Sequence, residues 1–136
     1  MSTRSLTFVK DDTNRVLLNM YQQYDGYPSG IGKELYEFLK DIKMVNGLSS
    51  GQPARVANGA GCLAAQIVAH FKDGPGGVYL HHPASKDCGQ EYEYHITAGD
   101  SGITVKVMEA GWSGHRAKKL YQGDVEGFGA FCAKDD

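Results

Sequence analysis

The chain has 136 residues, of which 41% are hydrophobic, and this is enough to line one core but not two. Its 14 basic and 16 acidic side chains leave a formal net charge of −2, which argues against a protein that coats long nucleic acid. No apolar run approaches the roughly 20 residues of a membrane span. We therefore expect a single domain over residues 1–136, with neither membranes nor long nucleic acid as partners.

Cysteine usage and the first residues indicate a cytoplasmic setting. The three cysteines, Cys62, Cys88 and Cys132, are odd in number and widely spaced, unlike the paired cysteines of a disulfide framework. Residues 1–10 are polar and already alternate, which is not the pattern of a secretory signal. We expect reduced thiols.

The first half of the chain predicts a hairpin followed by two helices. Residues 6–10 and 15–21 have extended, β-favouring patterns on either side of a turn-forming segment. Residues 31–42 carry apolar side chains at helical spacing with charges between them, which predicts a short amphipathic helix. After a polar loop, residues 60–71 predict a second helix with few charges, which Asn58 could cap.

The second half changes to a period of two, which is typical of strands. In residues 91–97 this places Tyr92, Tyr94 and Ile96 on one face, opposite Glu91, Glu93 and His95. Turns are expected at 99–102 and 111–114, and residues 128–132 could add a short terminal helix. The order ββααββββ predicts an α+β fold: a mainly antiparallel sheet of about six strands with two helices packed on one face. The four strands expected in this half are residues 78–82, 91–97, 103–108 and 117–121.

A glycine- and tyrosine-rich stretch leads into the first predicted helix. At a helix start the unpaired N–H groups and the helix dipole favour an anion, and tyrosine rings can stack on a base. The simpler interpretation is a turn whose glycines adopt special dihedral angles and whose tyrosines cover the edge of the core. The candidate binding residues here are Tyr21, Tyr24, Asp25, Tyr27, Gly30, Gly32 and Lys33.

The start of the second predicted helix is also rich in glycine. Asn58, Gly59 and Gly61 could supply backbone N–H groups to an anion, and the helix start could lower the pKa of the Cys62 thiol. Close packing of the first helical turn against the sheet explains the same glycines without a ligand, and buried cysteine often acts as a small hydrophobic residue.

The histidines do not have the spacing of a metal site. His81 and His82 are adjacent, so on a strand they point to opposite faces. His81 and His95 could share a face on paired strands, but close ligand pairs such as C-x₂-C are missing from the sequence. We expect no metal and no cofactor.

Three segments resemble a family of small uncharacterised proteins of bacteriophages and bacteria. The segments are residues 20–28 with the two glycines that follow, residues 58–71, and residues 87–92, and the resemblance spans about residues 4–122. It implies no assured activity and no catalytic residues. It does imply a phage accessory protein in the host cytoplasm, and small phage proteins often bind a host protein or sequester a host signalling nucleotide.

The leading functional hypothesis is a non-enzymatic binder of a phosphorylated small molecule or nucleotide. The tyrosines would stack on a base, Asp25 would accept hydrogen bonds from the base or ribose, and the glycine amides with Lys33 would hold an anion. An alternative is a protein-interaction or self-assembly module, homo-oligomeric or bound to a host protein, that uses the edge of the last strand and Trp112. A second alternative is a small hydrolase that uses Cys62 or a Glu–His pair.

Overall fold

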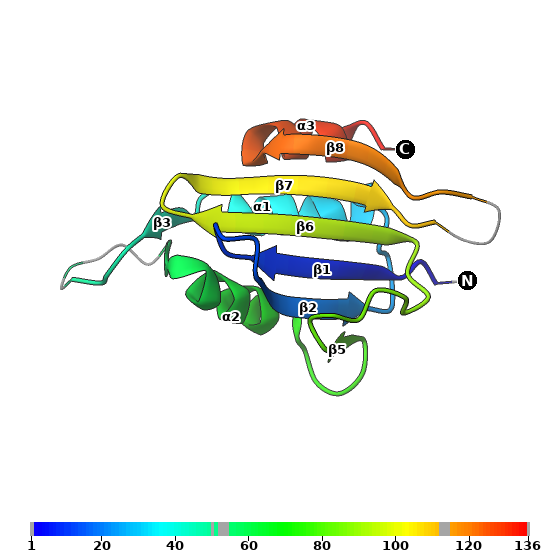
Figure 1. Ribbon diagram of the computed structural model, residues 1–136, viewed down its shortest axis with the longest axis horizontal. Helices are drawn as coiled ribbons and strands as arrows, with labels where there is room; N and C mark the ends of the chain where they lie inside the picture. The colour runs from blue at the N-terminus through cyan, green and yellow to red at the C-terminus, as the bar shows by residue number, and fades with distance from the viewer. Residues whose placement is uncertain (1, 50, 52–54, 112–114, 136) are drawn as a thin grey trace.

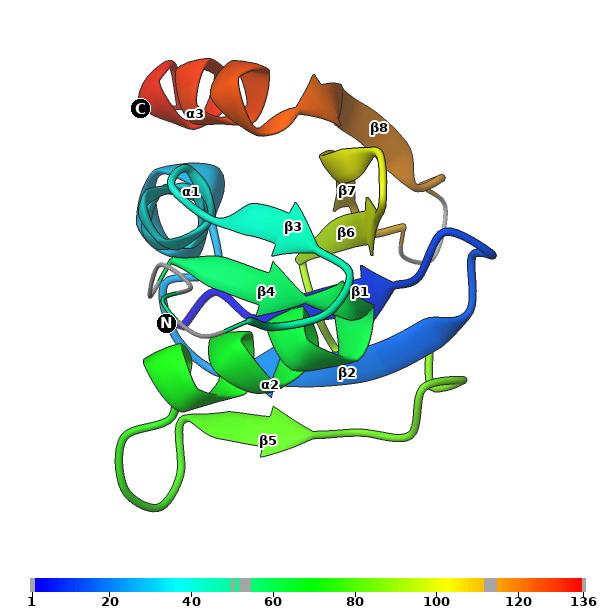
Figure 2. The same ribbon diagram turned by 90° about the vertical axis from the view of Figure 1, so that its left-hand side faces the viewer.

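The computed structural model describes residues 2–49, 51, 55–111 and 115–135, and these form a six-stranded sheet with three α-helices on one face (Figures 1 and 2). The strands lie in the order β5 (Val78–Leu80), β2 (Val16–Gln22), β1 (Ser5–Lys10), β6 (Tyr92–Gly99), β7 (Gly102–Glu109) and β8 (Lys118–Asp124). The helices are α1 (Lys33–Leu39), which follows a π-helical turn η1 (Pro28–Gly32), α2 (Gly59–Phe71) and α3 (Val125–Ala133).

The register confirms the predicted α+β fold with a mainly antiparallel sheet. β1 pairs with β2 in antiparallel orientation and with β6 in parallel orientation, and the other pairs in this sheet are antiparallel. A parallel pair needs a crossover connection. The segment between β2 and β6 supplies it, because it carries α1 and α2 across one face of the sheet.

Two features add to the predicted order. The terminal helix that residues 128–132 could add is present as α3, which begins earlier, at Val125, where the Asp124 side chain caps it by accepting a hydrogen bond from Gly127 N–H at 2.8 Å. A small parallel sheet joins β3 (Lys43–Val45) and β4 (Val56–Asn58) on either side of the predicted loop. Strands of three residues show too little alternation to be predicted from the sequence.

The main core lies between the sheet and the helices. Leu35 of α1, Leu63 of α2 and Phe128 of α3 are each 0% exposed and belong to one cluster with the inward side chains of the strands. The predicted dry face of residues 91–97 is confirmed for Tyr94 and Ile96, which are also in this cluster. Within the described residues, none of the helices has the length and apolar character that crossing a membrane requires.

The opposite face of the sheet, which we call the helix-free face, is also partly buried. Leu6 and Phe8 of β1 and Asn19 of β2 point to this face, yet at most 5% of each residue is exposed. The loop of residues 81–91 covers them, because Asn19 Nδ2 donates hydrogen bonds to the carbonyl oxygens of His82 at 3.0 Å and Ser85 at 2.9 Å. This face therefore has a floor of strands and one wall of loop.

Candidate functional site

The middle of the helix-free face brings together ionisable side chains from three neighbouring strands. His95 of β6 lies between Phe8 of β1 and Lys106 of β7 in the register. Lys10 and Glu93 lie two residues along from Phe8 and His95, and therefore point to the same face. Strand pairing thus gathers one carboxylate, one imidazole and two ammonium groups.

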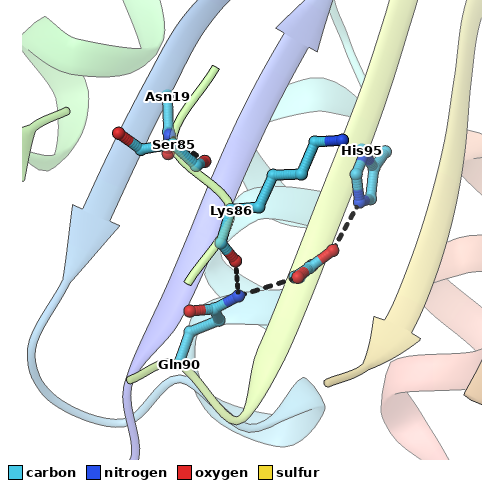
Figure 3. Close-up of polar contacts among 6 residues, drawn as sticks. Asn19, Ser85, Lys86, Gln90 and His95 are labelled. Carbon is cyan, nitrogen blue, oxygen red and sulfur yellow. Dashed lines mark hydrogen bonds and ion pairs between the residues drawn. The ribbon is translucent and has the colours of Figure 1, made fainter. Parts of the chain in front are cut away.

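Glu93 and His95 form a hydrogen-bonded pair under the 81–91 loop. His95 Nε2 lies 2.9 Å from Glu93 Oε1, and the imidazole stacks on the Phe8 ring at a centroid distance of 4.7 Å. Gln90 Nε2 donates to Glu93 Oε2 at 2.8 Å and to the carbonyl oxygen of Lys86 at 2.7 Å (Figure 3). Gln90 therefore connects the loop to the pair.

The surroundings favour a neutral imidazole beside an ionised carboxylate. Burial lowers the pKa of His95, and nearby Lys10 and Lys106 lower it further against the opposing effect of Glu93. Burial alone would raise the pKa of Glu93, but hydrogen bonds from His95 and Gln90 outweigh it and lower that pKa. Among the described residues no group bonds to His95 Nδ1, which is buried. The imidazole is therefore poorly placed to exchange a proton with a ligand.

A small polar pocket lies beside His95. It has a volume of about 110 Å³, and the ammonium-bearing side chains of Lys10 and Lys106 line it. Burial and the charge of Lys106 lower the pKa of Lys10, which Glu93 partly opposes. None of the described residues in the lining is acidic, so the pocket offers an anion hydrogen-bond donors without a competing carboxylate. The lining residues are Lys10, Asn14, His95, Thr97, Thr104, Val105, Lys106 and Gln122.

A second, more apolar hollow adjoins the polar pocket. It has a volume of about 200 Å³, and Lys10 and His95 line both cavities. Phe8 forms part of its floor, and Pro83 and Lys86 belong to the 81–91 loop. Figure 3 shows the Lys86 side chain extending from the loop toward His95. The lining residues of this apolar hollow are Phe8, Lys10, Val16, Pro83, Lys86, Glu93 and His95.

A larger cavity of about 670 Å³ is lined by the second half of the 81–91 loop, the start of β6 and the end of β7. Its lining includes the carboxylates of Asp87, Glu91, Glu93 and Glu109. Like charges repel, so this cavity suits a phosphorylated ligand less well than the smaller polar pocket does.

The predicted residues before the first helix form a tight turn. Tyr24, Asp25 and Tyr27 are exposed, and the Tyr27 hydroxyl lies 3.4 Å from the Asp25 carboxylate. Ser29 N–H, in the turn that was expected to hold an anion, donates to the carboxylate of Asp135 at 3.0 Å. The chain's own C-terminal segment therefore supplies a negative group at this position.

The glycines of this turn are required by close packing. A Cβ on Gly30 would overlap the carbonyl oxygen of Asp25, and a Cβ on Gly32 would lie 3.0 Å from Cys132 Sγ. Lys33 begins α1 and is exposed. Tyr21 lies elsewhere, on the helix-free face of β2, where its ring contacts those of Tyr79 and His81.

The start of α2 lies apart from this turn. Asn58 occupies the N-cap position of α2, but its side chain makes no capping hydrogen bond; its side-chain oxygen accepts a hydrogen bond from Gly47 N–H, after β3, at 2.7 Å. Gly59 has a φ of 83°, which favours glycine, whereas Gly61 is exposed in the first helical turn. The glycine-rich turn lies at the N-terminal end of α1, where Gly32 is close to Cys132. Gly47, which bonds to the residue before α2, comes after the C-terminal end of α1. The two starts therefore do not form one site.

Two glycine substitutions should have opposite effects on stability. Gly30→Ala should lower the free energy of unfolding by about 1 to 2 kcal/mol, because the new Cβ would overlap the Asp25 carbonyl oxygen. Gly61→Ala should raise it by up to about 1 kcal/mol, because alanine is the better helix former and its Cβ would meet no atom within 4 Å. Urea unfolding of both variants measures this. If both substitutions changed the free energy of unfolding by the same amount, close packing would not explain Gly30.

Sequence reasoning missed most residues of the helix-free site. It placed Glu93 and His95 on one polar strand face, but Lys10, Lys86 and Lys106 had no signal that joined them. Lys10 and Lys106 meet because β6 pairs with both β1 and β7, whereas Lys86 belongs to the 81–91 loop. Trp112 and the predicted 111–114 turn lie wholly or largely outside the described residues. Within the described part of the chain, no group of three or more His, Cys, Asp or Glu side chains is arranged to hold a metal.

Searches against family models, curated proteins and solved structures find no match to the chain. The polar pocket, the apolar hollow and the pair between them are the features that a functional proposal has to explain.

Proposed function

We propose that this protein binds a small phosphorylated molecule of nucleotide type on the helix-free face of its sheet. The observation that carries the proposal is the polar pocket, where Lys10 and Lys106 meet without an acidic residue in the described lining. A phosphate group would lie between these two ammonium groups, within reach of the hydroxyls of Thr97 and Thr104. Ammonium groups and hydroxyls are ordinary donors to phosphate oxygens.

The adjoining apolar hollow supports an organic ligand over a free inorganic ion. A ring in this hollow would contact Phe8, Val16 and Pro83, and Lys86 could reach a second acceptor. Three lysines and one glutamate line the two cavities, which leaves a local net charge of +2 with His95 neutral. In the setting that the sequence resemblance implies, such a protein would sequester a signalling nucleotide of the host.

Two observations favour ligand binding over the alternatives. A hydrolase based on the Glu93–His95 pair would need a free imidazole nitrogen, whereas Nε2 bonds to Glu93 and Nδ1 is buried. An edge-pairing module would need an open strand edge. Lys72 Nζ bonds to the Val78 carbonyl oxygen at the β5 edge, and β8 has lysines and a bulge in its pairing with β7, features that hinder strand addition.

Neutralising Lys106 should weaken the binding of adenosine monophosphate about tenfold, the cost of one lost hydrogen bond to a charged group. Isothermal titration calorimetry of Lys106→Gln measures this. Lys33→Gln is the matched control, because it removes the same charge at the exposed start of α1. If Lys33→Gln weakened binding and Lys106→Gln did not, the ligand would lie at the glycine-rich turn.

A further inference from the structure

Lys10 occupies a particular place in the proposed site, because it lines both cavities. A ligand with its phosphate in the polar pocket and its ring in the apolar hollow would have to pass the Lys10 side chain. This inference rests on the proposed phosphate-binding site and concerns the chemistry that Lys10 could perform on a phosphorylated ligand that carries a carbonyl group.

The surroundings of Lys10 suit a nucleophilic amine. The side chain is partly buried, and the ammonium of Lys106 is a like charge nearby, so both effects lower the pKa of Lys10. The charged groups that face it are Lys106, Lys86 and Glu93, together with the neutral His95. Among the described residues no carboxylate forms an ion pair with Lys10. A lysine beside a second cation is a known arrangement for an amine that attacks carbonyl groups.

Other lysines of the chain provide a contrast. Lys40 lies 2.8 Å from Glu37, and this hydrogen bond raises the pKa of Lys40. An amine held as an ammonium ion has no lone pair with which to attack a carbonyl carbon. Two features therefore distinguish Lys10 from an ordinary surface lysine: it lines both cavities, and a second lysine, Lys106, lies nearby.

We propose that Lys10 forms a Schiff base with a phosphorylated aldehyde or ketone bound across the two cavities. Lys10 first releases a proton to solvent, and the lone pair of the neutral Nζ then attacks the carbonyl carbon and forms a C–N bond. The carbonyl oxygen then leaves as water with the two hydrogens of the amine, which gives an imine without oxidation or reduction. Lys106 and the two threonines hold the phosphate during this step, and Phe8 and Val16 contact the ligand body.

Pyridoxal 5′-phosphate is a suitable probe, because it carries an aldehyde, an aromatic ring and a phosphate. The full-length protein is incubated with substoichiometric probe, the imine is reduced with cyanoborohydride, and the modified lysines are mapped by mass spectrometry. Pyridoxal, which lacks the phosphate, is the matched ligand. We expect Lys10 to be modified about tenfold faster by the phosphorylated probe, the effect of one hydrogen bond to a charged group.

Matched variants, matched probes and phosphate binding decide the outcome. Lys10→Arg should abolish the fast modification, whereas Lys118→Arg, outside both cavities, should leave it unchanged. Modification spread evenly over Lys10, Lys40 and Lys118, or equal rates with the two probes, would overturn the proposal. Binding of inorganic phosphate to the unmodified protein is measured separately. Phosphate binding without a Lys10 imine would overturn only the Schiff base, and absence of both would overturn the site itself.

Discussion

Replacing Phe128 with alanine should lower the free energy of unfolding by about 3 to 5 kcal/mol, which is the usual cost of removing a buried aromatic ring. Phe128 is 0% exposed, and its ring lies 6.1 Å from that of Tyr94 and 6.3 Å from that of Tyr121. The substitution would leave a cavity where α3 packs on the sheet. Because small domains are stable by only about 5 to 15 kcal/mol, this loss is a large share of the total.

Urea unfolding followed by circular dichroism measures the effect, and Phe131→Ala is the matched control. Phe131 lies on the same helix and stacks on Tyr121 at 5.6 Å, but it is only partly buried. Its loss should therefore cost less than the loss of Phe128. If both variants lost the same free energy of unfolding, Phe128 would not be the main contact that holds α3 on the sheet.

Sequence patterns were sufficient for the strand whose Tyr94 contacts Phe128. Alternation in residues 91–97 correctly placed Tyr94 and Ile96 toward the core, because a strand with one covered face repeats every two residues. The same rule placed Glu93 and His95 together on the other face. For α3 the sequence predicted only residues 128–132 of Val125–Ala133, since the helix is short and its glycines make its helical pattern weak.

The helix-free site could not be predicted, because it depends on contacts between residues far apart in the sequence. Lys10 and Lys106 approach each other only after β1 pairs with β6 and β6 with β7. The wall of the apolar hollow depends on Asn19, a residue whose role in holding a distant loop has no local signature. The glycine-rich turn, by contrast, was conspicuous in the sequence. Its structure explains Gly30 and Gly32 by close packing, whereas the sequence had suggested special dihedral angles, and neither glycine has a positive φ.

Asn19 should affect both the stability of the protein and ligand binding, because it holds the 81–91 loop on the sheet. Asn19→Ala should lower the free energy of unfolding by about 2 to 3 kcal/mol, because two hydrogen bonds to the 81–91 loop and a buried side chain are lost together. Without these bonds the loop should leave the sheet more often. Hydrogen exchange of the amides in residues 82–90 should then become faster than in the unmodified protein.

The effect on binding should depend on the ligand. Pro83 and Lys86 belong to this loop and line the apolar hollow but not the polar pocket, which is formed by the strands and Asn14. Adenosine monophosphate should therefore bind the Asn19→Ala variant about tenfold more weakly, which is the effect of losing one contact to a charged group. The affinity for inorganic phosphate should not change. Asn46→Ala, in an exposed turn, is the control. If the variant lost the same affinity for both ligands, the phosphate too would bind under the loop. If it lost affinity for neither, the loop would not be part of the binding site.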